Sequence, residues 1–290
     1  MVTVSVIVCT YNQENTIRRT LDAILSQKCD CAFEIIIGED ASTDDTRKIC
    51  EEYVSRFPKI IRLMPKTKNK GIVDNYYDCV REAQGQYIME CGGDDEWCPG
   101  RIQLCLDAIR KHPEVVQIFT QVYYRKETTG EISEPTNNLF PFGCLKGNVV
   151  INGLMHQRSD QTVSYAMTLR SAIIEIIEKY PSFFRGRKYY AEDKQLTVLL
   201  GTKGSFLNLP DRTYYYTIDT GSITRGDLVK HLRYNVNMLI LNHDLSKAVG
   251  YKGNMLPLYY DTIYVMCRLT IWRGLRFFLQ KVRNLHAFRN

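Results

Sequence analysis

The 290-residue sequence has no uninterrupted apolar stretch that approaches the roughly 18 residues a membrane-spanning helix needs. Neither G-x-G-x-x-G nor G-x-x-x-x-G-K-[ST] occurs at its first turn, which argues against a dinucleotide-dependent dehydrogenase and a P-loop NTPase. No C-x-x-C pair occurs with a matching Cys or His pair among the ten cysteines, so we expect no structural zinc. With 44% hydrophobic and 24% charged residues, the composition is that of an ordinary soluble globular protein.

The start of the sequence also lacks a basic leader and a small-residue cleavage site. Ten cysteines without a secretory signal suit a reducing compartment, where thiols stay free, so we expect a cytoplasmic protein. The formal charge of +6 would suit nucleic acid, anionic lipid or phosphorylated substrates. Because no nucleic-acid recognition motif accompanies this charge, we predict no nucleic-acid partner.

Strand and helix patterns alternate along the chain. Apolar runs predict strands at residues 2–9, 33–38, 60–64, 87–91, 115–124, 162–169, 205–209 and 212–217, and helical periodicity marks residues 14–27, 47–57, 72–83, 99–112, 171–179 and 189–200. Residues 127–147 read as loop. This order predicts an α/β fold with a mostly parallel sheet covered by helices. We place one domain at residues 1–224 and a helical extension at residues 225–290.

A polar turn follows each of the first four predicted strands. In a largely parallel sheet these turns converge at the carboxyl edge, where ligands bind. The turns contain Thr10, Tyr11, Asn12 and Glu14; Glu39, Asp40 and Ser42; Lys68 to Gly71; and Asp94 with Asp95. Together they offer hydrogen-bonding groups, a basic loop and carboxylates, which suits a nucleotide diphosphate held partly through Mg²⁺ or Mn²⁺. Adjacent carboxylates such as Asp94 and Asp95 also commonly cap a helix or lie in water.

Five motifs in order resemble those of the family 2 glycosyltransferases of the GT-A fold, over roughly residues 3–224. They are residues 4–12, residues 39–46, Asn69-Lys70-Gly71 with Asn75, Gly93-Asp94-Asp95-Glu96-Trp97, and Glu192-Asp193. The resemblance implies that the nucleotide-sugar is held by Thr10, Tyr11, Asn12, Glu14, Asp40, Ser42, Lys70, Gly71, Asn75 and Asp94. It further implies Mn²⁺ or Mg²⁺ at Asp94 and Asp95, and Asp193 as catalytic base, with Glu192 as the alternative. A helix cap remains the competing interpretation of the Glu192-Asp193 pair.

Two positions depart from the family pattern. Gly92 stands where the family usually has the first acid of an acid-x-acid motif, which leaves Asp94 as the expected ligand. Asp219 lies where many relatives carry a histidine near the pyrophosphate; it either supplies part of the missing negative charge or is a plain loop carboxylate. Glu90, two residues before Gly92, either faces the same side of its strand or is structural.

The resemblance implies an inverting, hexosyltransferase-like enzyme. It would move a sugar from a nucleotide-diphosphate sugar, with a UDP-sugar as the leading candidate, to an acceptor hydroxyl in surface polysaccharide or glycan assembly. The acceptor would be a glycan or a lipid-linked molecule. The alternative function is a nucleotide-sugar-binding protein without turnover, because Gly92 and Asp219 depart where the chemistry should occur.

Positive charge gathers at two places that bear on the acceptor. Arg185, Arg187 and Lys188 precede the expected base, and either contact an anionic acceptor or are solvated. After Asp261 the chain has no acidic residue, and apolar residues recur at three- and four-residue steps: Leu269, Trp272, Leu275, Leu279 and Val282. Residues 262–290 therefore predict a basic amphipathic helix, which either lies on an anionic membrane, at its inner face, or packs on the catalytic domain.

Overall fold

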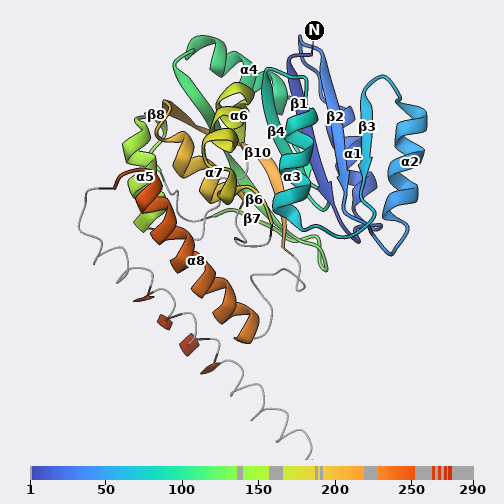
Figure 1. Cartoon of the computed structure of the whole chain (residues 1–290). Coiled ribbons are helices and arrows are strands. Elements are labelled where there is room, and N and C mark those ends of the chain that lie inside the picture. The colour runs from blue at the N-terminus through green and yellow to red at the C-terminus, as the bar shows by residue number, and fades with distance from the viewer. Residues whose placement is uncertain are drawn as a thin grey trace, which may run out of the picture.

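The computed structural model describes residues 2–135, 140–156, 166–186, 189, 192–218 and 228–251, with residues 263–264, 267–268, 271–272 and 274–275 near the end of the chain. Within these residues, one mixed sheet runs through the protein and helices pack on it (Figure 1). The predicted α/β class with a mostly parallel sheet is confirmed.

The sheet contains ten strands among the described residues, in the order β3-β2-β1-β4-β9-β6-β10-β5, with β7 on β6 and β8 on β10. Their bounds are β1 (Val4–Thr10), β2 (Phe33–Glu39), β3 (Ile61–Pro65), β4 (Tyr87–Gly92), β5 (Glu96–Trp97), β6 (Val115–Lys126), β7 (Ile132–Ser133), β8 (Gly143–Leu145), β9 (Ala166–Leu169) and β10 (Ser205–Ile218). Strands β3, β2, β1 and β4 are parallel, as are β6 and β10. Strand β9 lies antiparallel between β4 and β6.

Helices form two layers because alternate strand side chains point to opposite faces. Val6 and Val8 of β1 pack with α1 (Ile17–Leu25), α2 (Thr46–Arg56) and α4 (Arg101–Lys111), whereas Ile7 packs with the opposite layer. That second layer contains α3 (Ile72–Glu82), α5 (Gly147–His156), α6 (Arg170–Lys179), α7 (Glu192–Leu200) and α8 (Leu228–Ala248), with the short 3₁₀ helix η1 (Pro181–Phe183). The core therefore lies on both faces of the sheet.

Several elements differ from the sequence prediction. The short strands β7 and β8 lie within residues 127–147, which were predicted as loop, and two longer elements differ as well. The two strands predicted at residues 205–209 and 212–217 are one strand, β10, whose register against β6 shifts between Asn208 and Arg212. Pro210 lies at that shift, where a missing backbone donor is tolerated. Helix α5 was not predicted, because Gly153 interrupts its pattern. A Cβ at Gly153 would lie 2.4 Å from a ring carbon of Phe140, so close packing requires glycine there.

The parallel strands β1 to β4 all end at one edge of the sheet, which lies toward the bottom of Figure 1 because β1 begins near the marked N-terminus at the top. The turns after β1, β2 and β3 and the acidic motif after β4 leave from this edge. The predicted convergence of these turns follows directly from the observed topology.

The segment after residue 224 is only partly described. Met238, Leu241 and Leu245 of α8 join the core. The described residues between 263 and 275 are helical and, apart from the half-buried Gly274, exposed, with Ile271 70% and Leu275 58% exposed. The boundary predicted at residues 224 and 225 falls outside the described residues and stays a prediction. No described helix combines the length and the apolarity needed to cross a membrane.

Candidate functional site

The turn after β1 is locked to the turn after β2. Asn12 has a φ of 53°, in the left-handed region that asparagine tolerates better than most residues. Its amide donates to Ser42 Oγ at 3.0 Å, and its Oδ1 accepts from the Thr43 amide at 2.8 Å. Both predicted contact residues, Asn12 and Ser42, therefore lie together at the carboxyl edge.

Three further hydrogen bonds tie the same two turns. The Glu14 amide donates to Asp44 Oδ2 at 3.1 Å, the Asp45 amide donates to Glu14 Oε2 at 2.9 Å, and the Gln13 amide donates to Thr46 Oγ1 at 2.7 Å. Partial burial raises the pKa of Asp44, but hydrogen bonds from Thr46 and from the Glu14 amide outweigh it and leave that pKa below its usual range. The two turns thus form one preorganised surface, in which the Glu14 carboxylate already accepts a hydrogen bond from the Asp45 amide.

Asp40 clamps the third turn to the second. The side chain is 3% exposed, and its Oδ1 and Oδ2 accept hydrogen bonds from the amides of Lys70 and Gly71, each at 2.8 Å. Gly71 has a φ of 90°, which favours glycine. Since both carboxylate oxygens are bound, Asp40 holds the β3–α3 loop against the site in this structure.

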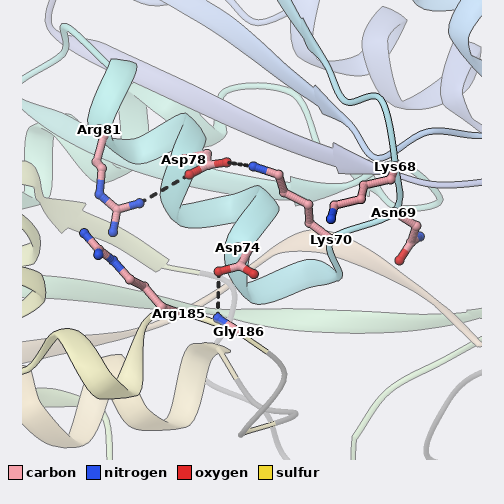
Figure 2. A pocket seen from close by; sticks show the side chains of 8 residues that line it. All are labelled: Lys68, Asn69, Lys70, Asp74, Asp78, Arg81, Arg185 and Gly186. Carbon is pink, nitrogen blue, oxygen red and sulfur yellow. Dashed lines mark hydrogen bonds and ion pairs between the residues drawn. The ribbon is translucent and has the colours of Figure 1, made fainter.

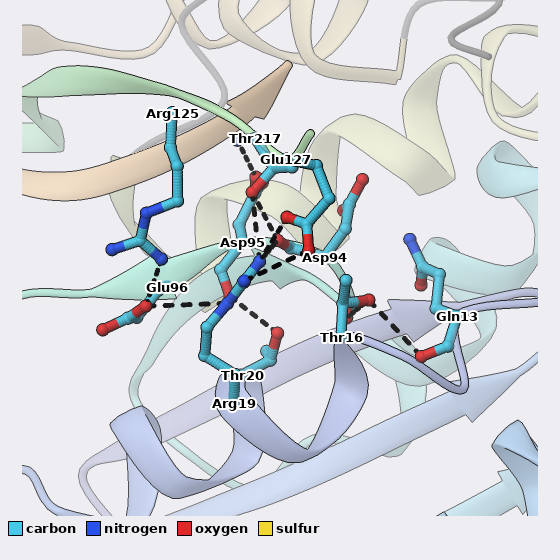
Figure 3. Close-up of polar contacts among 11 residues, drawn as sticks. Gln13, Thr16, Arg19, Thr20, Asp94, Asp95, Glu96, Arg125, Glu127 and Thr217 are labelled. Carbon is cyan, nitrogen blue, oxygen red and sulfur yellow. Dashed lines mark hydrogen bonds and ion pairs between the residues drawn. The ribbon is translucent and has the colours of Figure 1, made fainter. Parts of the chain in front are cut away.

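Asp94 and Asp95, which follow β4, have different surroundings (Figure 3). Asp95 is 4% exposed; its Oδ2 accepts from the Tyr214 hydroxyl at 2.8 Å and its Oδ1 from the Thr217 amide at 2.7 Å. Burial, and then the neighbouring Asp94 charge, raises the pKa of Asp95 well above its usual range. Because both oxygens of Asp95 bond inward, the geometry fits a role in fixing the loop, and leaves Asp94 as the better metal ligand of the two.

The backbone of Asp94 is fixed from both sides. Its carbonyl oxygen accepts hydrogen bonds from Arg19 Nη2 at 2.9 Å and from Thr217 Oγ1 at 2.5 Å (Figure 3). Arg19 is itself paired with Glu127 at 2.9 Å and lies 3.6 Å from Glu96. The loop that carries the half-buried Asp94 side chain is therefore rigidly supported.

Glycine at position 92 has a steric reason. A Cβ added at Gly92 would lie 2.8 Å from Asp94 Oδ1 and 2.9 Å from Asp95 Oδ2, closer than side-chain carbons approach. An acid at residue 92 would displace both carboxylates from their observed positions. The inward placement of Asp95 thus requires glycine at residue 92, where the family pattern has an acid.

Asp193 lies in the first turn of α7, and its Oδ1 accepts a hydrogen bond from the Lys194 amide at 2.7 Å. Lys194 is 5% exposed, and burial lowers its pKa to about 7 against the opposing effect of Asp193. Glu192 begins the same helix, but its side chain, together with Arg187, Lys188 and Asp219, lies outside the described residues.

The other predicted site residues divide into edge and core. Tyr11 is 43% exposed at the edge, whereas Thr10 is 3% exposed and its hydroxyl donates to Gln13 Oε1 at 2.8 Å. Asn75 is 1% exposed, and its Nδ2 donates to the Gly38 carbonyl at 2.7 Å. Trp97 is 2% exposed in the core. The structure thus gives Asn75 and Trp97 packing positions.

The sequence analysis missed the residues that support the acidic loop, namely Arg19, Tyr214 and Thr217. Arg19 lies on a helix and the other two lie in β10, more than 110 residues along the chain from Asp95. No local pattern marks any of them, since they meet Asp94 and Asp95 only after the sheet has formed.

Of the residues that the structure describes, those at this edge can hold a metal only with help from a ligand. Among the described residues, no group of three or more His, Cys, Asp or Glu side chains could hold a metal ion. Mg²⁺ and Mn²⁺ nevertheless bind through one or two carboxylates plus substrate phosphates and water, and the half-buried Asp94 carboxylate fits that donor set. The site therefore fits a metal that arrives with a diphosphate.

A family model described as Glycosyl transferase family 2 matches residues 5–177, more than half of the chain. The chain belongs to this family. Among curated proteins, an uncharacterized protein of Mycobacterium tuberculosis is 32% identical over 161 residues, which cover 55% of this chain and 45% of that protein. The putative glycosyltransferase EpsE of Bacillus subtilis is 35% identical over 109 residues, covering 38% and 39%. The chain thus spans less than half the length of each of these relatives.

Solved structures show the same fold. The structure of S. aureus TarS in complex with UDP aligns with a TM-score of 0.57 and 19% identity, covering 82% of this chain and 65% of that chain. GalNAc-T7 with UDP, GalNAc and Mn²⁺ aligns with a TM-score of 0.60 and 14% identity, covering 81% and 47%. The expected GT-A architecture is confirmed.

Proposed function

We propose that this family 2 member is an inverting glycosyltransferase. It moves a sugar from a UDP-sugar to an acceptor hydroxyl of a glycan or lipid-linked molecule in surface polysaccharide or glycan assembly. The observation that carries the proposal is the interlocked carboxyl edge, where the side-chain oxygens of Asn12, Glu14 and Asp40 accept backbone hydrogen bonds that hold three turns beside Asp94. Neighbours of the same fold bound to UDP and to UDP-GlcNAc support the donor class.

The donor occupies this edge. Thr10, Asn12, Ser42 and Glu14 shape the nucleotide and ribose surface, and the exposed ring of Tyr11 offers a stacking face. Lys70 and Gly71, held by Asp40, close the surface from the third turn. Asp94, together with the diphosphate, would hold Mn²⁺ or Mg²⁺, which would supply charge stabilisation for the departing diphosphate.

Asp193 acts as the base, with Glu192 as the alternative. Its carboxylate takes the proton of the acceptor hydroxyl while that oxygen bonds to the anomeric carbon, and the bond from the anomeric carbon to the diphosphate oxygen breaks on the opposite side. One in-line displacement inverts the anomeric configuration, and the nucleoside diphosphate leaves with the electron pair. The carboxyl end of the sheet aligns donor and acceptor for this step.

Thermal-shift screening tests the donor class. We expect UDP with Mn²⁺ or Mg²⁺ to raise the melting temperature by roughly 5–10 °C at about 100 times its Kd, because the nucleotide binds only the folded edge. GDP, CDP and dTDP are tested in the same way for comparison, and EDTA removes the metal. A larger shift with another nucleotide would overturn the UDP assignment, and no shift with any nucleotide would overturn donor binding at this edge.

We also propose that residues 225–290 form a helical extension whose basic tail lies on the cytoplasmic face of a membrane. The exposed apolar side chains of Ile271, Trp272 and Leu275, with the basic residues of the same segment, support this placement. A lipid-linked acceptor would be reached from that surface.

Liposome flotation tests the membrane proposal. We expect the full chain to float with vesicles that contain anionic lipid, and the Ile271→Asp/Leu275→Asp double variant to bind them at least about tenfold more weakly, because it loses apolar burial and adds negative charge. Ile132→Asp, at an exposed site on β7, is the matched control. Equal flotation of the double variant and the control would exclude the tail as the anchor.

A further inference from the structure

A polar groove runs along α3, next to the loop that Asp40 clamps. Its lining residues are Lys68, Asn69, Lys70, Asp74, Asp78, Arg81, Arg185 and Gly186, and its volume is about 780 Å³ (Figure 2). Asp74, Asp78 and Arg81 follow one another at helical spacing on one face of α3. Arg185 and Gly186 approach from the segment between η1 and α7. The groove thus extends from the proposed donor loop toward the far end of α3.

Both carboxylates in the groove already have partners within the protein. Asp78 pairs with Lys66 at 2.8 Å, Lys70 at 3.3 Å and Arg81 at 3.4 Å. Burial alone would raise the pKa of Asp78, but Lys66 and Lys70 outweigh it and lower that pKa. Asp74 accepts a hydrogen bond from the Gly186 amide at 2.8 Å. Four cationic side chains therefore line the groove with two carboxylates that are both engaged.

Two guanidinium groups face each other across the groove. Figure 2 shows the Arg81 and Arg185 side chains pointing toward one another. Arg81 Nη2 is buried and has no hydrogen-bond partner among the described residues. Arg185 is exposed, and no ion pair of its side chain is found in the described part of the chain. Facing like charges repel, so an anion bound between them would stabilise this arrangement.

We propose that this groove binds a phosphate ester group of the acceptor, held between Arg81 and Arg185. Phosphate is the anion that suits two guanidinium groups, because each can donate paired N–H groups to its oxygens. The groove begins at Lys70, so a phosphate held there would anchor the acceptor beside the donor loop. The inference rests on the proposed glycosyltransferase function and names its acceptor class: a phosphorylated molecule in place of a neutral glycan.

Phosphate-ester binding to the full chain tests the site. Glycerol phosphate and farnesyl phosphate are titrated separately, with ³¹P NMR line broadening as the readout, and the two probes distinguish a soluble from a lipid-linked source. We expect Arg81→Gln and Arg185→Gln each to weaken binding about 10- to 100-fold, since each loses charge-assisted hydrogen bonds. Arg110→Gln is the matched control, because Arg110 is an exposed arginine that pairs with Asp30 far along the surface.

Arg185→Gln keeps the test independent of folding, since Arg81 also pairs with Asp78 whereas Arg185 is exposed. Wild-type affinity in Arg185→Gln, or an equal loss in Arg110→Gln, would overturn the proposal. UDP-dependent thermal shifts of the same variants separate the two claims. A normal UDP shift with no phosphate-ester binding refutes the groove alone, whereas phosphate-ester binding without any nucleotide shift refutes the donor proposal and leaves the groove as an anion site.

Discussion

Replacing Asp193 by Asn is expected to lower sugar transfer by about 10²- to 10⁴-fold, the usual contribution of a general base. Asparagine cannot take the acceptor proton, yet its side-chain oxygen can still accept the hydrogen bond that Asp193 Oδ1 receives from the Lys194 amide. The variant therefore removes the base while keeping the cap. Initial rates of UDP release with acceptor, measured under donor saturation, give the effect on kcat.

Two variants at this position, with a control elsewhere, separate the role of base from that of helix cap. Asp193→Ala removes both functions and is expected to cost about 0.5–2 kcal/mol of stability, as loss of a helix cap does. Asp211→Asn, at an exposed position of β10, controls for the charge change. Full activity in Asp193→Asn with lowered stability in Asp193→Ala would show that Asp193 is only a cap. That result would leave two explanations: Glu192 is the base, or the chain is a nucleotide-sugar-binding protein without turnover.

The second large effect is expected at Asp94. Asp94→Asn should remove the metal-dependent part of the UDP thermal shift and lower transfer by about 10²-fold or more, since metal stabilisation of charge is worth several kcal/mol. The physical reason is that Asp94 is the half-buried carboxylate of the pair, whereas both oxygens of Asp95 are bonded to Tyr214 and Thr217. UDP titrations with Mn²⁺ and with EDTA measure the loss.

Asp95→Asn is the informative comparison. We expect it to keep metal-dependent UDP binding but to lower the melting temperature, because one inward donor is left imperfectly paired. The reverse pattern, in which Asp95→Asn loses metal dependence and Asp94→Asn keeps it, would make Asp95 the ligand. The loop would then have to rearrange when the nucleotide binds.

Most elements of the fold were predictable because their signals are local. The runs that became β1 and β2 are β-branched, and the spacing of Ile17, Leu21 and Ile24 marks the buried face of α1. Helix α5 and the unbroken strand β10 escaped prediction for a different reason. Gly153 and Pro210 look like breakers in the sequence, and only the packing against Phe140 and the register shift against β6 accommodate them.

The location of the site at the carboxyl edge was likewise predictable, but the contacts between its residues were not. Strand order along the chain was enough to bring Asn12, Asp40, Lys70 and Asp94 to one edge. The sequence did not show that both carboxylate oxygens of Asp40 would accept hydrogen bonds from amides of the β3–α3 loop. Which of these residues contact a donor stays a prediction that the nucleotide screen and the Asp94 variants test.

The sequence by itself determined the α/β class, the order of the turns and the resemblance that the family match bears out, because periodicity and short motifs are written in neighbouring residues. Tertiary structure alone decided which acid of the Asp94-Asp95 pair turns inward, since Tyr214 and Thr217 reach it from β10. It also brought Arg81 and Arg185 to one groove. Contacts between residues about a hundred positions apart depend on how the sheet and its helices pack, and no local pattern encodes them.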